Sequence, residues 1–135
     1  MAGQKGTGRW TAIEALRAGV PAPSIAAAVD ARVLSSMRTL RVRASEALAG
    51  PADRPAPADP DAFAADARDA LLASRIATFA QGFDLIRRVS VERGWGIPLD
   101  EVARVWRAGC IIRNRLLVPM RQALGTDAGR ENLLL

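Results

Sequence analysis

Apolar residues recur at steps of three and four along most of this 135-residue chain, and no segment alternates apolar and polar residues with a period of two. The longest such series runs from Ile25 through Val33 and Leu40 to Leu48. This period gives a helix one apolar face, whereas a half-buried strand needs strict alternation. The pattern therefore predicts an all-α fold, a helical bundle without a β-sheet.

Two long helices are expected to form the frame of this bundle. The first is predicted to have Ser24 as its N-cap and to continue unbroken until Gly50, about seven turns later. A proline-rich loop over residues 51–60 leads to the second, which is expected to begin at Asp61 as N-cap and to end near Gly94. We interpret the loop as a connection inside one domain.

Shorter helices are expected at both ends of the chain. The first is predicted to begin at Arg9 and to end at Gly19. Another follows Pro98, because the fixed φ angle of proline suits a first helical turn. A last helical run is predicted from Ile111, with Pro119 bending or restarting it.

Composition excludes several classes of protein. No apolar segment approaches the ~20 residues of a membrane span, so no membrane partner is expected. The chain has no histidine, which removes the histidine base, metal ligand and triad member, and no metal site is expected. The single cysteine, Cys110, forms no disulfide within the chain, which favours a cytoplasmic location. The formal charge of +5 permits a phosphate-bearing partner, either nucleic acid or a small phosphorylated metabolite.

Two features allow both a functional and a structural interpretation. The first is the glycine-rich segment GQKGTG, residues 3–8. Its backbone N–H groups, with Lys5 and Thr7, could bind an anion. The structural interpretation is a flexible start of the chain followed by a helix cap. The segment is not a Walker A loop, because Arg9 and Trp10 stand where that motif needs lysine and serine or threonine. Arg32 lies at the border of an apolar face, where it either covers apolar surface with its stem or binds phosphate or carboxylate in a cleft.

The segment WRAGCIIR, residues 106–113, contains the only thiol. Without a histidine to activate Cys110, a catalytic thiolate is disfavoured, and we interpret the segment as a tightly packed helix corner. Phe79 and Phe83 have the spacing of core residues, and Asp66 and Asp69 that of a solvated face.

Five sets of motifs resemble those of the decarboxylating 6-phosphogluconate dehydrogenases. The run GQKGTGRWT, residues 3–11, is similar to a family signature in which a basic residue, tryptophan and threonine follow the glycine loop. The others are ARVLSS at 31–36, ASRI at 73–76 with AQGF at 80–83, WRAGCIIR at 106–113 and NLLL at 132–135. They stand in the family's order and cover almost the whole chain. Arg9, Arg75, Ala108 and Pro119 depart from the family pattern.

The resemblance implies a fold, an activity and a site. Residues 1–135 would be the first part of the family's helical C-terminal domain, with the NADP-binding Rossmann domain and the C-terminal tail outside them. The family oxidises and decarboxylates 6-phosphogluconate to ribulose 5-phosphate with NADP, as a homodimer, in the pentose phosphate pathway. The resemblance also implies that Lys5, Thr7 and Arg32 contact the substrate phosphate. The family's catalytic lysine and glutamate precede the glycine loop, so no catalytic residue is expected in this chain.

Two further expectations concern the isolated chain and the alternative function. The chain ends on Leu133, Leu134 and Leu135, which suggests that it is cut before its natural end. We expect the isolated chain to be inactive and to self-associate. The alternative is a small basic helical module that binds nucleic acid, supported by the charge of +5. Arginines spread over every predicted helix disfavour it, so no nucleic-acid partner is expected.

Overall fold

The computed structural model describes residues 5–50, 56–126 and 131–135. Within these ranges the chain forms six helices and no strand, so the all-α prediction is confirmed. The helices are α1 (Thr7–Arg17), α2 (Pro23–Ser36), α3 (Arg38–Ala47), α4 (Pro60–Glu92), α5 (Leu99–Val105) and α6 (Leu117–Thr126). None of these helices combines the length and the apolar character needed to cross a bilayer.

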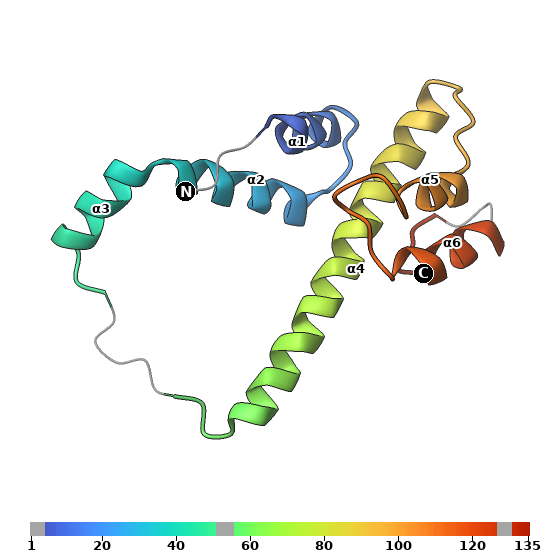
Figure 1. Cartoon of the computed structure of the whole chain (residues 1–135). Coiled ribbons are helices and arrows are strands. Elements are labelled where there is room, and N and C mark those ends of the chain that lie inside the picture. The colour runs from blue at the N-terminus through green and yellow to red at the C-terminus, as the bar shows by residue number, and fades with distance from the viewer. Residues whose placement is uncertain (1–4, 51–55, 127–130) are drawn as a thin grey trace.

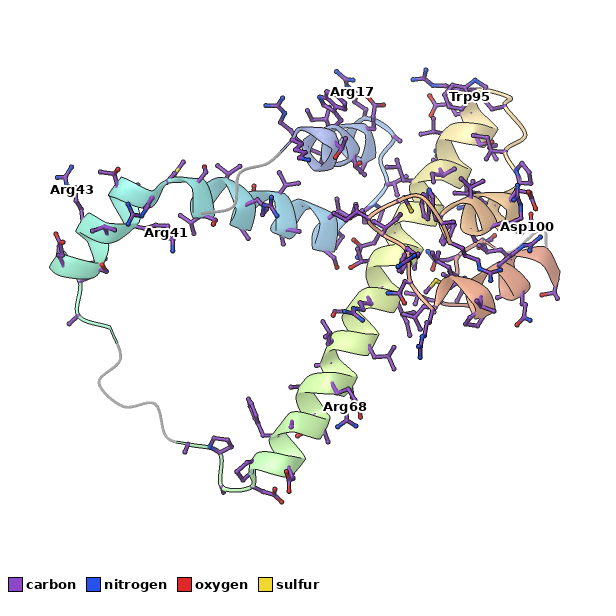
Figure 2. The ribbon with its side chains drawn as sticks, in the orientation of Figure 1. Arg17, Arg41, Arg43, Arg68, Trp95 and Asp100 are labelled. Carbon is purple, nitrogen blue, oxygen red and sulfur yellow. The ribbon has the colours of Figure 1, made fainter. Side chains whose placement is uncertain are left out.

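The 33-residue helix α4 is the central helix of the fold, and all the other helices except α3 lie beside its second half (Figure 1). Helices α5 and α6 pack on each other beside its second half, and α1 and α2 form a hairpin that meets α4 mainly through α2. Helix α3 continues away from α4, and the first half of α4 extends away from α5 and α6 (Figure 1). Arg41 and Arg43 on α3 and Arg68 on α4 lie on these projecting parts (Figure 2).

The main core lies between the second half of α4 and the pair α5–α6. Phe83 of α4 is 1% exposed and packs in a cluster with Ala103, Leu117, Met120 and Leu124. The ring of Phe83 is 5.1 Å from that of Trp106, measured between centroids. Phe79 packs against the same cluster, so the sequence prediction of core roles for both phenylalanines is confirmed.

A second, smaller cluster attaches the helical hairpin to α4. Its buried members are Ala15 of α1, Val20 of the α1–α2 connection and Leu85 of α4. Helix α1 buries this alanine, whereas Trp10 and Leu16 on its apolar side are 59% and 83% exposed. Helix α1 therefore contributes a small side chain to this contact, and its larger apolar side chains remain at the surface.

The prediction of one unbroken helix from Ser24 to Gly50 is wrong, because the helix breaks at Met37. Met37 has ψ of 54°, outside the helical range, and separates α2 from α3. Ser36 donates its hydroxyl hydrogen bond to the carbonyl of Val33, and the Arg41 guanidinium donates to the carbonyl of Ser35. These side-chain bonds compete with the helical backbone ladder, and no buried residue of α2 or α3 holds the two segments in line.

Both predicted N-caps are also displaced. The N-cap of α4 is Asp59, whose carboxylate accepts from the backbone N–H groups of Asp61 and Ala62, so Asp61 lies inside the first turn. The N-cap of α2 is Ala22, and Ser24 lies in the first turn after Pro23. In each case a proline at the first helical position places the cap one residue before it.

The last helix begins later than predicted. Residues 111–116 form two turns joined by irregular backbone at Arg113 and Asn114, and α6 begins at Leu117. The Asn114 carbonyl accepts the Leu117 N–H, and the Asn114 side chain accepts the Leu116 N–H. Pro119 is then the third residue of α6. Its missing N–H costs nothing there because the first helical N–H groups have no partner within the helix.

Candidate functional site

Of the glycine-rich segment, residues 6–8 form the N-cap and the first residues of α1, Lys5 precedes them, and residues 3–4 lie outside the described ranges. Gly6 is the buried N-cap with φ of 104°, a conformation that glycine adopts without the strain a Cβ would bring. Thr7 is the first residue of α1, and its first turn, residues 7–10, contains no acidic residue. Lys5 and Thr7 are exposed. The free N–H groups of this turn, the helix dipole and the Lys5 charge together favour an anion.

Arg32 lies on α2 at the same end of the hairpin as Lys5. A Cβ built on Gly8 would be 3.2 Å from Cγ2 of Val29, so the first turn of α1 touches α2 at Val29. Helices α1 and α2 run in opposite directions (Figure 1), so Lys5 and Thr7, before Gly8, lie at the same end as the residues of α2 that follow Val29. Arg32 is exposed and is about one turn beyond Val29. The fold thus brings the start of α1 and the helix that carries Arg32 together across more than 20 residues of sequence.

An open groove of about 960 Å³ lies between α1, α4 and the segment that follows α5. Its lining includes residues from four of the short motifs that the sequence analysis singled out: Thr7, Trp10, Thr11, Ser74, Arg75, Gly82, Trp106, Ile111, Ile112 and Arg113. Segments far apart in sequence therefore meet on one surface. Of the three residues predicted to bind phosphate, Thr7 lines this groove, and Lys5 and Arg32 are not among its lining residues.

The groove combines an apolar wall with a few polar groups. Phe79, Leu85 and Trp106 contribute apolar surface, and the rings of Phe79 and Trp106 are 6.4 Å apart. Arg75 and Arg113 bring positive charge to the same groove. Both arginines belong to short sequence motifs, ASRI and WRAGCIIR, but their sequence context predicts no role for either arginine. Only packing across α4 shows that they share a surface.

The segment around Cys110 is a series of turns at the edge of this groove. The Cys110 thiol is exposed, and its Sγ lies 3.0 Å from the carbonyl oxygen of Trp106, to which it donates. Among the residues of the described ranges, no three His, Cys, Asp or Glu side chains cluster as a metal site would require.

Comparison with known proteins identifies relatives over the whole chain. The family model described as "6-phosphogluconate dehydrogenase, C-terminal domain" matches residues 1–135. The decarboxylating 6-phosphogluconate dehydrogenases of Ovis aries and Synechococcus elongatus are each 48% identical over 134 residues, which is 99% of this chain and 28% of each relative. The chain therefore spans less than a third of the length of these relatives.

A solved structure has the same arrangement of helices. It is the 6-phosphogluconate dehydrogenase of Plasmodium falciparum, described in its apo form and in complex with NADP+ and with its substrate 6-phosphogluconate. It matches with a TM-score of 0.89 at 38% identity, over 99% of this chain and 29% of the other.

Proposed function

The chain belongs to the family of 6-phosphogluconate dehydrogenase C-terminal domains, and from that premise we propose that it works as part of an NADP-dependent, decarboxylating 6-phosphogluconate dehydrogenase. The enzyme oxidises 6-phosphogluconate, passes a hydride to NADP and releases CO2 to form ribulose 5-phosphate. Residues 1–135 are one part of its helical domain, and its proposed location is the cytoplasm. Family membership favours this function over the alternative nucleic-acid-binding module.

The contribution of this chain is to hold the phosphate of the substrate. The start of α1 offers backbone N–H groups and the ammonium of Lys5, and Thr7 adds a hydroxyl donor. Arg32 adds a guanidinium whose paired donors suit phosphate oxygens. The observation that carries this proposal is the contact of Gly8 with Val29, which puts both sources of donors at one end of the hairpin. Proton transfer and NADP binding belong to segments of the enzyme other than these residues.

The chain also contributes surface to a homodimer. Apolar side chains are exposed along α2, at the break between α2 and α3, along α3 and along the first half of α4, namely Leu34, Met37, Leu40, Val42, Phe63, Leu71 and Leu72. Exposed apolar surface on this scale is typical of an interface. Most of this surface lies on the two projecting parts of the molecule (Figure 1), and Leu34 lies on α2, two residues beyond Arg32.

A chimeric enzyme tests the function directly. The matching 134-residue segment of the Ovis aries relative is replaced by this chain, and NADPH formation from 6-phosphogluconate is measured. The chimera is expected to be active, whereas the 135-residue chain alone is expected to form no NADPH. An active isolated chain would contradict the assignment of catalysis to other segments, and an inactive but folded chimera would contradict the proposed function.

Single substitutions in the chimera test the phosphate site. Lys5→Met and Arg32→Met each remove a charged hydrogen bond worth about 1.5–3 kcal/mol, so each should raise KM for 6-phosphogluconate roughly 10-fold to 100-fold. Thr7→Val removes a neutral donor and should raise KM by less than about 10-fold. The control is Arg43→Met, which removes the same charge from α3 (Figure 2) and should leave KM unchanged. Equal KM values for Arg32→Met and the control would overturn the site.

A further inference from the structure

Gln81 of α4 forms a reciprocal pair of hydrogen bonds with Ser24 of α2. The backbone N–H of Ser24 donates to Oε1 of Gln81 at 3.0 Å, and Nε2 of Gln81 donates to Oγ of Ser24, also at 3.0 Å. The two residues are 57 positions apart in sequence, and the bonds are partly buried. Gln81 belongs to the AQGF motif, to which the proposed function gives no role.

The pair supplies the cap that α2 lacks in its own sequence. The first N–H groups of a helix have no partner within the helix, and a side chain at the N-cap usually accepts one of them. The N-cap of α2 is Ala22, which has no polar side chain, and no side-chain cap bond is formed there. The amide of Gln81 accepts the Ser24 N–H in its place, from another helix. These hydrogen bonds fix the orientation of α2 on α4, whereas apolar packing in the cluster of Ala15, Val20 and Leu85 does not depend on a bond angle.

Helix α2 carries the phosphate-binding end of the hairpin. Arg32 lies eight residues beyond Ser24, which is about 12 Å along the helix axis. A tilt of α2 by about 5° at Ser24 would therefore move the backbone of Arg32 by about 1 Å. Because Gly8 touches Val29, the start of α1 moves with α2, and so do Lys5 and Thr7.

We propose that Gln81 is a positioning residue: its bonds to Ser24 fix the hairpin on α4, and so set where Lys5, Thr7 and Arg32 present the substrate phosphate relative to the rest of the enzyme. This inference rests on the proposed function of the hairpin. Loss of the bonds leaves the three phosphate-binding residues together, because they all lie on the hairpin. The affinity for phosphate is retained, and the alignment of the substrate at the reacting carbon is lost.

The test compares Gln81→Met, Gln81→Glu and Gln122→Met in the chimeric enzyme. Methionine keeps the size of glutamine without its hydrogen bonds, and Gln122 is an exposed glutamine of α6 that serves as the matched control. Gln81→Met should lower kcat about 10-fold to 100-fold, the effect expected of a 1 Å misplacement, with KM changed less than about 3-fold. Gln81→Glu should restore kcat, because its carboxylate accepts from the Ser24 N–H and hydroxyl and suits the helix N-terminus.

Amide hydrogen exchange in the 135-residue chain gives a second readout that does not need activity. Gln81→Met should speed exchange of the Ser24 N–H about 3-fold to 10-fold, as expected for a lost hydrogen bond, while Gln122→Met leaves it unchanged. An unchanged kcat in Gln81→Met, or a Gln81→Glu variant as slow as Gln81→Met, would overturn the inference. If the unsubstituted chimera is inactive, the proposed function fails instead. Unchanged Ser24 exchange would then still overturn the contact between Gln81 and α2.

Discussion

Two of the three phenylalanines of helix α4 have surroundings that differ so strongly that the same substitution should have very different effects. Phe83 is 1% exposed in the main core, and Phe63 is 61% exposed in the first turn of the helix. Both are replaced by alanine in the 135-residue chain, so the helix and the chemical change are held constant. Phe63→Ala is thus the matched control for Phe83→Ala.

The two magnitudes follow from burial. Truncating a buried phenylalanine costs about 3–5 kcal/mol of unfolding free energy, because transfer energy is lost and a cavity remains. Phe83 should reach this range, since its ring contacts Trp106 and the cluster around Leu117. Phe63 buries less than half of its surface, worth roughly 1 kcal/mol, and alanine recovers about half of that through its higher helix propensity. The expected loss for Phe63→Ala is therefore about 0.5 kcal/mol.

Urea unfolding followed by far-ultraviolet circular dichroism measures both variants. The unfolding free energies are compared at several protein concentrations and extrapolated to infinite dilution, because association through exposed apolar surface would add apparent stability. Equal losses for Phe63→Ala and Phe83→Ala at infinite dilution would refute the reasoning. That result would mean that the first half of α4 is packed as tightly in the monomer as the second half.

Three further outcomes are expected of the same chain. The pKa of Glu101 lies below its ordinary value of 4.5, mainly because Arg104 donates a hydrogen bond to it and also because Arg121 lies nearby. The ionised Glu101 carboxylate stabilises the folded state above pH 4.5, and this stabilisation is lost as the pH falls through the lowered pKa. Glu101→Gln should therefore flatten the decline of Tm below pH 4.5. An unaltered decline would contradict this prediction. Gly6→Ala should lower the unfolding free energy by about 1–2 kcal/mol, because alanine is strained at the positive φ of Gly6. Gly82→Ala should raise the unfolding free energy by about 0.5–1 kcal/mol, because glycine destabilises the interior of a helix such as α4. Denaturant melts that rank the two variants in the opposite order would contradict this reasoning. Light scattering at micromolar concentration should show self-association of the chain, and a strictly monomeric species with a sharp melt would show that the exposed apolar surface needs no partner.

Local sequence signals were sufficient for the helices but not for their limits. The helical period predicted α4 from its spacing of apolar residues, and Gly94 ends it as expected. The same period continues through Met37, where the helix breaks. Periodicity records which residues share a face, and it cannot show whether a buried neighbour keeps a helix straight. Asp59 was missed as a cap because Asp61 offered the same chemistry two residues later.

The sequence by itself determined the helical class, because the period of the apolar residues is written along the chain. Its resemblance to a known family supplied the identity of the residues proposed to bind phosphate. Only the tertiary structure decided that Gly8 rests on Val29 and that Gln81 caps α2. It also decided that residues from four motifs share one groove. The physical reason is that contacts between helices depend on the angle and separation at which their surfaces fit together. A period of three and four residues shows which face of a helix is apolar, but it does not show which other helix packs on that face.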